Sequence, residues 1–213
     1  MRTYIYVDGF NLYYGAVKGT PCKWLDLKAL FSRLLAPHHQ ILSIKYFTAR
    51  ITARDGDSGA PLRQDVYLRA LQQYIPELSI HYGHFLSHPV KMPLAKPTAG
   101  HKFAEVIKTE EKGSDVNIAL HLLNDAWHDR YDCAIVVSND SDLAESLRMV
   151  RVERRKRIGI VTPGDPRLRP VAVQLRRYSH FTLSITPELL ATSQLPDPLP
   201  GTTIRKPDAW RKP

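Results

Sequence analysis

The sequence has only two cysteines, Cys22 and Cys133, in 213 residues. They are far apart and match no zinc-ligand spacing, and one pair is too few for a disulfide framework, which is typical of proteins in a reducing compartment. Long apolar runs are also missing, because no stretch reaches the ~18 uncharged residues of a membrane-spanning helix. The N-terminal apolar run is interrupted by Asp8, and no small-residue cleavage site follows it. We therefore expect a cytoplasmic protein without a membrane span.

Acidic residues are fewer than basic ones, with 21 Asp and Glu against 30 Lys and Arg and a formal net charge of +9. Such a surplus is typical of proteins that bind nucleic acids, although an anionic membrane surface or a basic protein without such a partner gives the same sum. The length allows one sizeable core. We expect one domain over residues 1–191 and a proline-rich basic tail over 192–213 that is extended or disordered.

Short β-rich runs alternate with helical patterns along the chain. Strands are expected at 3–7, 41–51, 78–86, 133–137, 157–161 and 181–185, and helices at 27–35, 61–74, 114–127 and 141–153. The runs at 133–137 and 157–161 are apolar at nearly every position, as in parallel strands covered on both faces. This order predicts an α/β fold, a three-layer α/β/α sandwich with a central, mostly parallel sheet.

Residues 87–101 interrupt the alternation. They carry three prolines, which predicts a long loop beside the sheet. A lid over the substrate groove is one hypothesis for this loop.

Acidic residues follow two of the expected strands, at the point where each strand ends. Asp8 follows the strand at 3–7, and Asp140 and Asp142 follow the strand at 133–137. Ligands of open parallel sheets bind beyond the carboxyl ends of the strands, so these carboxylates converge if the two strands are neighbours. Asp115 lies in the first turn of the helix at 114–127, with Ser114 as its expected N-cap. Its side chain can therefore point to the same end of the sheet, and we call this group of carboxylates the acidic rim.

Clustered carboxylates repel one another unless a cation neutralises them, and hard divalent metals take oxygen ligands. We therefore expect Mg²⁺ or Mn²⁺ at Asp8, Asp115, Asp140 and Asp142. Magnesium commonly shares its shell with phosphate oxygens, so an acidic rim on a basic protein implies a phosphodiester substrate. The metal would activate a water molecule and stabilise charge on the scissile phosphate.

Basic residues near the rim are candidates for holding the phosphate backbone of this substrate. Three arginines follow one another at spacings of three and four along 141–155, namely Arg148, Arg151 and Arg155. They form either a stripe for phosphates or an ordinary solvated face, and Lys112, beside a glycine turn, has the same two interpretations. Further basic residues would widen the footprint: Arg167, Arg169, Arg176, Arg177, Arg205, Lys206, Arg211 and Lys212.

Several residues of the acidic segments have two interpretations each. Tyr13 is close enough to Asp8 in sequence to stack a base, or it is a packing aromatic. Asn11 either caps the helix after the first strand or belongs to the active site. One of Asp140 and Asp142 is expected to cap the next helix while the other faces the metal, with Asp140 as the closer ligand.

Three stretches resemble, in order, the motifs of the NYN domain, a branch of the PIN-like nuclease superfamily that includes the LabA-like bacterial proteins. They are YVDGFNLY at 6–13, KGSDVNIALHLL at 112–123, and VVSNDSDL at 136–143 followed by IGIVTP at 158–163. The resemblance extends from about residue 2 to about residue 185.

The resemblance implies an α/β/α sandwich with a metal-dependent endoribonuclease site. The acidic positions of the family fall on Asp8, Asp115, Asp140 and Asp142, its motif asparagine on Asn11 and its motif serine on Ser138. Asn139 stands where glycine is common in the family, which changes a turn residue rather than a metal ligand, since asparagine tolerates left-handed backbone. Like Ser138, Asn139 is a candidate contact for the substrate.

The expected function is a divalent-metal-dependent endoribonuclease acting on single-stranded RNA, in which Asn11 and Ser138 orient water or phosphate. Two alternatives stay open: a non-catalytic RNA-binding or regulatory module that keeps the acids, and a small-molecule phosphohydrolase. A haloacid-dehalogenase-type phosphatase needs a second aspartate two residues after the first, where this chain has Phe10. RNA is the expected partner, and a homodimer is left open.

Overall fold

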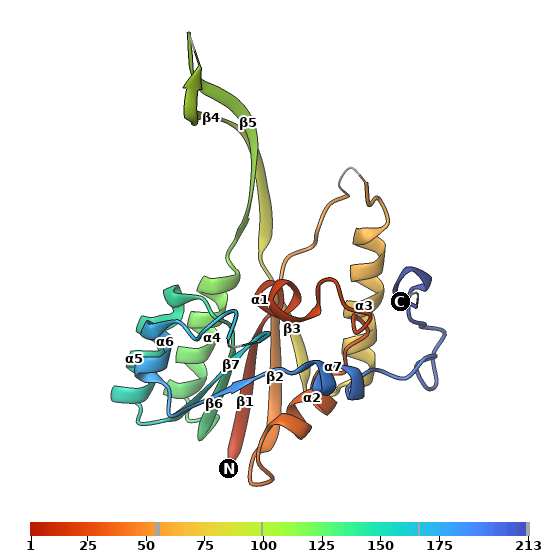
Figure 1. Ribbon diagram of the computed structural model, residues 1–213. Coiled ribbons are helices and arrows are strands. Elements are labelled where there is room, and N and C mark those ends of the chain that lie inside the picture. Colours follow the sequence, from red (N-terminus) through yellow and green to blue (C-terminus); the bar gives the residue numbers. More distant parts are fainter. Residues whose placement is uncertain (54–55, 99, 166, 212–213) are drawn as a thin grey trace.

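A sheet of six parallel strands forms the centre of the molecule in the computed structural model, which describes residues 1–53, 56–98, 100–165 and 167–211. Lys212 of the basic tail lies outside these residues. The strand order is β3-β2-β1-β6-β7-β8, and helices lie on both sides of the sheet (Figure 1). The α/β three-layer prediction is therefore confirmed. The strands are β1 (Arg2–Asp8), β2 (Gln40–Thr48), β3 (Leu78–Tyr82), β6 (Cys133–Val137), β7 (Arg157–Thr162) and β8 (Phe181–Ser184).

Alternate residues of the strands face two hydrophobic cores. On β1, Ile5 and Val7 pack with the helices of one face, whereas Tyr6 packs with those of the other. The first face is covered by α2 (Leu27–Leu34), α3 (Ala60–Tyr74) and α7 (Pro187–Thr192). The second is covered by α4 (Ser114–Trp127), α5 (Ala144–Val152) and α6 (Val173–Tyr178). Within the part of the chain that is described, no helix has the length and apolarity needed to cross a membrane.

The strand order brings the two acidic segments together. β1 pairs with β6 in parallel, and Val7 lies opposite Val137 at the carboxyl ends of the two strands. The strand order changes direction between β1 and β6, where open parallel sheets have their binding crevice. The short helix α1 (Gly9–Leu12) and the π-helical turn η1 (Tyr13–Val17) continue directly from β1 at this edge.

The segment expected as a loop is instead most of an antiparallel ribbon, so that prediction is wrong. β4 (His84–Thr98) pairs with β5 (His101–Lys112), and the ribbon projects away from the sheet rather than covering it as a lid (Figure 1). Its prolines, Pro89, Pro93 and Pro97, are spaced by four residues, so in a regular strand all three would have their nitrogen on the same side. A proline is tolerated where an N–H would point to solvent, and a two-stranded ribbon offers such a side.

The segment after α7 is mostly irregular and lies on the domain. Leu195 and Leu199 are 4% and 1% exposed and belong to the core that α2 and α3 form. Near its end, the ring of Trp210 in η3 (Asp208–Trp210) lies 6.5 Å from Trp24 and 6.1 Å from Tyr67, between ring centroids. The tail thus contributes side chains to the core from a distance of more than 100 residues along the chain.

A buried ion pair ties β2 to α4. Asp125 has no exposed side-chain surface, and it accepts hydrogen bonds from the Lys45 ammonium, from the Tyr6 hydroxyl at 2.7 Å and from Arg130 at 2.8 Å. Burial acts to raise the pKa of Asp125, but the hydrogen bonds from Lys45 and Tyr6 hold it below its ordinary value. Asp125 is therefore charged, and its loss would leave Lys45 buried without its counter-ion.

We expect Asp125→Ala to lower the free energy of unfolding by about 3–5 kcal/mol, because it leaves a buried ammonium unpaired. The matched control is Glu145→Ala, which removes an exposed ion pair with Arg148 and should cost less than about 1 kcal/mol. Urea denaturation of both variants measures the difference. Equal losses would contradict a structural role for the buried pair.

Candidate functional site

Asp8 ends β1 and is 3% exposed. Its Oδ1 accepts the backbone N–H of Asn11 at 2.9 Å, which makes Asp8 the N-cap of α1. Its Oδ2 accepts the Asn11 side-chain amide at 2.6 Å and the Ser138 hydroxyl at 3.0 Å. Burial raises the pKa of Asp8 against these hydrogen bonds, and the nearby Asp140 adds repulsion. The carboxylate is therefore held in one place from both β1 and the loop after β6.

Asn11 does not cap the helix, so that alternative is wrong. Asp8 occupies the cap position, and Asn11 lies in the first turn of α1 with its amide turned back to the aspartate. The Asn11 side-chain oxygen accepts the N–H of Asn139 at 3.4 Å. Both ends of this amide are therefore engaged within the protein, where they connect the loop after β1 to the loop after β6.

The loop after β6 carries two of the predicted acids. Ser138 is fully buried, donates to Asp8, and accepts the N–H of Asp140 at 3.1 Å. Asp140 caps the 3₁₀ turn η2 (Ser141–Leu143) by accepting the N–H of Asp142 at 2.9 Å. Asp142 is exposed. Of the two, Asp140 therefore caps the following turn, and it is also the acid whose charge acts on Asp8.

Asp115 lies in the first turn of α4 and faces the other acids. Burial raises its pKa to about 6, and repulsion from Asp8, Asp140, Glu111 and Asp142, in that order, adds to the shift. The order of these effects places Asp8 and Asp140 as the strongest electrostatic neighbours. The structure thus gathers the four predicted aspartates at one rim.

Glu111 is a fifth acid at this rim that the sequence reasoning missed. It accepts the backbone N–H of Ser114 at 3.2 Å and the Ser114 hydroxyl at 2.8 Å. Ser114 was expected to cap α4, but Gly113 is the cap residue, with φ of 98° in the left-handed region, and the Ser114 hydroxyl turns back to Glu111. The available signal was the spacing, because Glu111 lies three residues before the serine that opens α4. The glycine turn between them gave no indication that the two side chains would be in contact.

The donor set suits a hard cation in kind, because it consists of carboxylates whose charges disfavour one another. The carboxylates do not, however, converge on a common position where one metal ion could bind. Across 1–53, 56–98, 100–165 and 167–211, no three His, Cys, Asp or Glu side chains lie close enough to hold a metal ion jointly. Binding a metal at this rim would therefore require the exposed Asp142 and the half-buried Asp115 and Asp140 to move closer together.

The arginine stripe is largely engaged within the protein. Arg148 pairs with Glu145 at 2.7 Å and with Glu153 at 3.3 Å. Arg151 donates to two backbone carbonyls at 3.1 and 2.9 Å, beside α6. Arg155 is exposed, but it lies between α5 and the start of β7. This is the amino-terminal end of the parallel strands, whereas Asp8 lies at their carboxyl end. The three arginines therefore lead away from the acidic rim.

Two other predicted contact residues have partners of their own. Lys112 pairs with Glu110 at 3.1 Å and stays half-exposed beside Gly113. Asn139 donates to the Pro170 carbonyl at 3.0 Å and accepts the N–H of Ala172 at 2.8 Å, so its side chain fixes the segment before α6.

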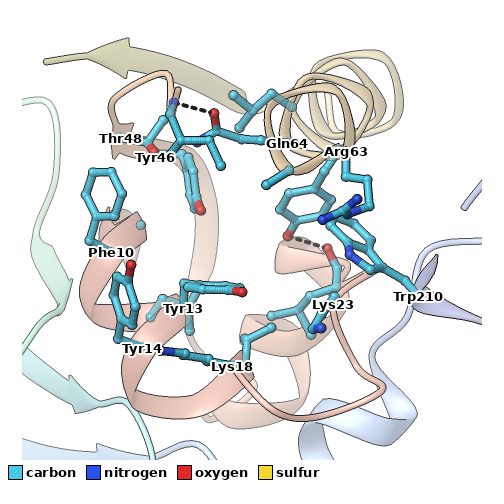
Figure 2. A pocket seen from close by; sticks show the side chains of 18 of the residues that line it. Phe10, Tyr13, Tyr14, Lys18, Lys23, Tyr46, Thr48, Arg63, Gln64 and Trp210 are labelled. Carbon is cyan, nitrogen blue, oxygen red and sulfur yellow. Dashed lines mark hydrogen bonds between the residues drawn. The ribbon is translucent and has the colours of Figure 1, made fainter. Parts of the chain in front are cut away.

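An aromatic-lined pocket of about 310 Å³ lies beside the acidic rim, where α1, η1, the end of β2 and α3 meet (Figure 2). Tyr13, predicted to stack a base, lines this pocket. The sequence reasoning missed the pocket because its walls come from distant segments. The aromatic lining residues are Phe10, Tyr13, Tyr14, Tyr46, Tyr67, Phe85 and Trp210.

Comparison with known proteins agrees with this architecture. The family model described as NYN domain matches residues 2–179. The crystal structure of a Vibrio parahaemolyticus protein of unknown function superposes with a TM-score of 0.54 at 18% identity, covering 88% of this chain and 94% of that one. This likeness concerns the fold alone.

A curated relative is similar along the whole chain. It is 6-hydroxy-3-succinoylpyridine 3-monooxygenase of Pseudomonas putida, 37% identical over 238 aligned positions. The match covers 99% of this chain and 75% of that protein.

We expect Asn139→Ala to loosen the segment before α6, because two hydrogen bonds are lost. Hydrogen exchange at the Ala172 amide should become faster, and the free energy of unfolding should fall by about 1–2 kcal/mol. Asn117→Ala, on the half-buried face of α4, is the control and should leave that amide unchanged. Unchanged exchange in Asn139→Ala would contradict the structural role and return the side chain to the candidates for substrate contact.

Proposed function

Because the chain belongs to the NYN domain family, we propose that it is a cytoplasmic, divalent-metal-dependent ribonuclease that cuts the phosphodiester bonds of single-stranded RNA. The observation that carries the proposal is the placement of three acids at the carboxyl ends of the neighbouring strands β1 and β6: Ser138 joins Asp8 to Asp140 by hydrogen bonds, and Asp115 opens α4 close enough for both charges to raise its pKa. Carboxylates that destabilise one another in this way favour a cation between them. The basic surplus of the whole chain favours an anionic polymer as substrate.

The four acids differ in how firmly hydrogen bonds hold their carboxylates in place. Asp8 is fixed by Asn11 and Ser138, which we assign as positioning residues for that carboxylate. Asp140 is fixed through one oxygen by the turn that it caps. Asp115 and Asp142 would complete the set, and bound Mg²⁺ or Mn²⁺ would supply a water of lowered pKa and offset the charge of the scissile phosphate.

The phosphate backbone needs cations other than the arginine stripe. Lys112 precedes Gly113 and so stands beside the helix that carries Asp115. Arg169 is exposed, and its guanidinium lies next to Gly15, where a Cβ would be 3.2 Å from it. Lys112 lies beside Gly83, which follows β3, and Arg169 lies near Pro163, which follows β7, so the two are on opposite sides of the β1–β6 pair in the strand order. We propose them as contacts for RNA.

The assay is cleavage of labelled single-stranded RNA with Mg²⁺ or Mn²⁺. We expect Asp8→Asn and Asp140→Asn each to reduce the rate on the order of 100-fold, because each removes a charged ligand of the metal that offsets the charge of the reacting phosphate. Asp129→Asn is the matched control, since Asp129 pairs with Arg2 at the opposite edge of the sheet and is 63% exposed. A chelator should abolish cleavage.

Equal rates in the wild type and both variants would refute the nuclease. Tight RNA binding without cleavage under either metal would favour a non-catalytic RNA-binding module. Release of phosphate from small phosphomonoesters without RNA cleavage would favour a phosphohydrolase.

A second candidate function is the oxygenation of a hydroxylated pyridine acid. It is favoured by the 37% identity, along 99% of this chain, to the monooxygenase of that substrate class. The aromatic pocket with its basic residues is a second observation in its favour. Such a reaction puts one atom of O₂ into the ring and reduces the other to water, so it needs O₂ and a two-electron reductant.

The second function predicts O₂ uptake that depends on 6-hydroxy-3-succinoylpyridine when a reduced nicotinamide nucleotide is supplied. An oxygen electrode, with product identified by mass spectrometry, measures it. Because the pocket and the acidic rim use different residues, Asp140→Asn should leave this uptake unchanged within about twofold. No substrate-dependent uptake with either reduced nicotinamide nucleotide, with or without added flavin, would rule the second function out.

A further inference from the structure

The pocket beside the acidic rim has the walls of a ligand site. Its volume of about 310 Å³ is at the lower end of the range for small-molecule sites. Rings from five separate parts of the chain line the space, and Figure 2 labels Phe10, Tyr13, Tyr46 and Trp210 among them. Flat walls of this kind favour a flat occupant, because aromatic rings pack best against other rings in offset or edge-to-face arrangements.

One wall offers a hydrogen-bonding group without a partner. Tyr46 is 7% exposed, and its hydroxyl points into the pocket (Figure 2). It makes no hydrogen bond to any residue in the described part of the chain, whereas the Tyr67 hydroxyl donates to the Leu25 carbonyl at 2.9 Å. Burial, and secondarily the charge of Asp8, raise the pKa of Tyr46, so the hydroxyl keeps its proton and is available as a donor. The hydroxyl opens onto the pocket and is not enclosed by protein, so it is available to donate a hydrogen bond to an acceptor on an occupant.

The lining is positively charged. Among the described lining residues, Lys18, Lys23 and Arg63 are basic and Asp57 is the single acid. Arg63 is held by Asp57, and its side chain is 21% exposed. The Lys18 ammonium lies 4.9 Å from the centre of the Tyr14 ring. The surplus of cations favours an anionic occupant and disfavours a neutral or cationic one.

We propose that this pocket binds a small planar aromatic acid: its ring lies between the tyrosine and tryptophan walls, an acceptor on the ring meets the Tyr46 hydroxyl, and its carboxylate faces Lys23 and Arg63. The volume of about 310 Å³ suits a small ligand of one ring with a short side chain. A nucleobase within an RNA strand is less suited, because Tyr46 belongs to the α3 face of the sheet whereas Asp8 follows Tyr6 on the α4 face. The inference deepens the second candidate function, because it gives the substrate class of that function a binding site, and it is argued from the pocket residues, so binding can be tested without either activity.

The first test compares ligands by titration, with quenching of tryptophan fluorescence as the signal, since Trp210 lines the pocket. The probe is nicotinate, a pyridine carboxylate, and we expect a dissociation constant below about 1 mM. Nicotinamide removes the charge and should bind at least about tenfold more weakly. Cyclohexanecarboxylate removes the planarity and should bind at least about fivefold more weakly. Equal affinity for nicotinate and either control would overturn the proposal, and so would tighter binding of uridine monophosphate, which would assign the pocket to nucleotides.

The second test compares variants. Tyr46→Phe removes one hydroxyl and should weaken nicotinate roughly three- to tenfold. Arg63→Gln removes a lining charge, leaves Asp57 unpaired, and should weaken it about tenfold or more. Arg69→Gln, on the same helix but exposed and away from the pocket, is the matched control and should bind as the wild type does. Wild-type affinity in both pocket variants would overturn the site.

A third variant separates this inference from the ribonuclease. Asp140→Asn is expected to lose RNA cleavage yet to bind nicotinate within about twofold of the wild type, because Asp140 neither lines the pocket nor acts on Tyr46. Nicotinate binding in a protein that never cuts RNA would refute the nuclease and leave the pocket standing. RNA cleavage without nicotinate binding would do the reverse.

Discussion

The region around the acids depends on the burial of one carboxylate, Asp8, where β1 meets β6. A buried carboxylate is costly unless several donors compensate for its lost hydration. The donors here come from both sides, with Asn11 just after β1 and Ser138 just after β6. The contacts that hold the acid are thus the same contacts that join the two loops at the switch point of the sheet. Fold and site are coupled through this one group, since a change that frees Asp8 for chemistry also releases the loops.

Much of the sandwich could be predicted from the sequence because its signals are local. The strands at 133–137 and 157–161 are apolar throughout, and the helix at 114–127 repeats its apolar residues at spacings of three and four. Parallel strands need crossover connections, so alternation alone indicates the layers. The acids were predicted by the same logic, since Asp8 ends one buried strand and Asp140 lies three residues after another. The strand order itself was not predicted. The sequence indicated only that the acids would converge if their strands were neighbours, and the structure places β1 beside β6.

The features that were missed depend on contacts between distant residues. Taken alone, the prolines of β4 predict an interruption of the strand. Because β4 pairs only with β5, its other side faces solvent, and prolines on that side lose no hydrogen bond. Strand pairing therefore overrides the local signal. The arginines along α5 repeat as a binding stripe would, yet Glu145 and the carbonyls beside α6 already engage Arg148 and Arg151. Spacing shows which residues share a helix face, but it does not show what that face meets. The same limit explains why the pocket was missed, because its walls come from distant segments. Glu111 is a different case, since its partner Ser114 is only three residues away.

The two candidate sites share one short motif because of the way α1 leaves the sheet. Successive residues of a helix point in directions about 100° apart, so Asp8 and Asn11 serve the acids while Phe10 serves the pocket. Gly9 stands between them, and a Cβ there would lie 2.7 Å from the Tyr46 ring. A side chain at this position would push Tyr46 out of the pocket wall, or α1 away from β2. The glycine beside the aspartate is therefore a condition for both sites at once, and the motif that marks the acids also builds the edge of the pocket.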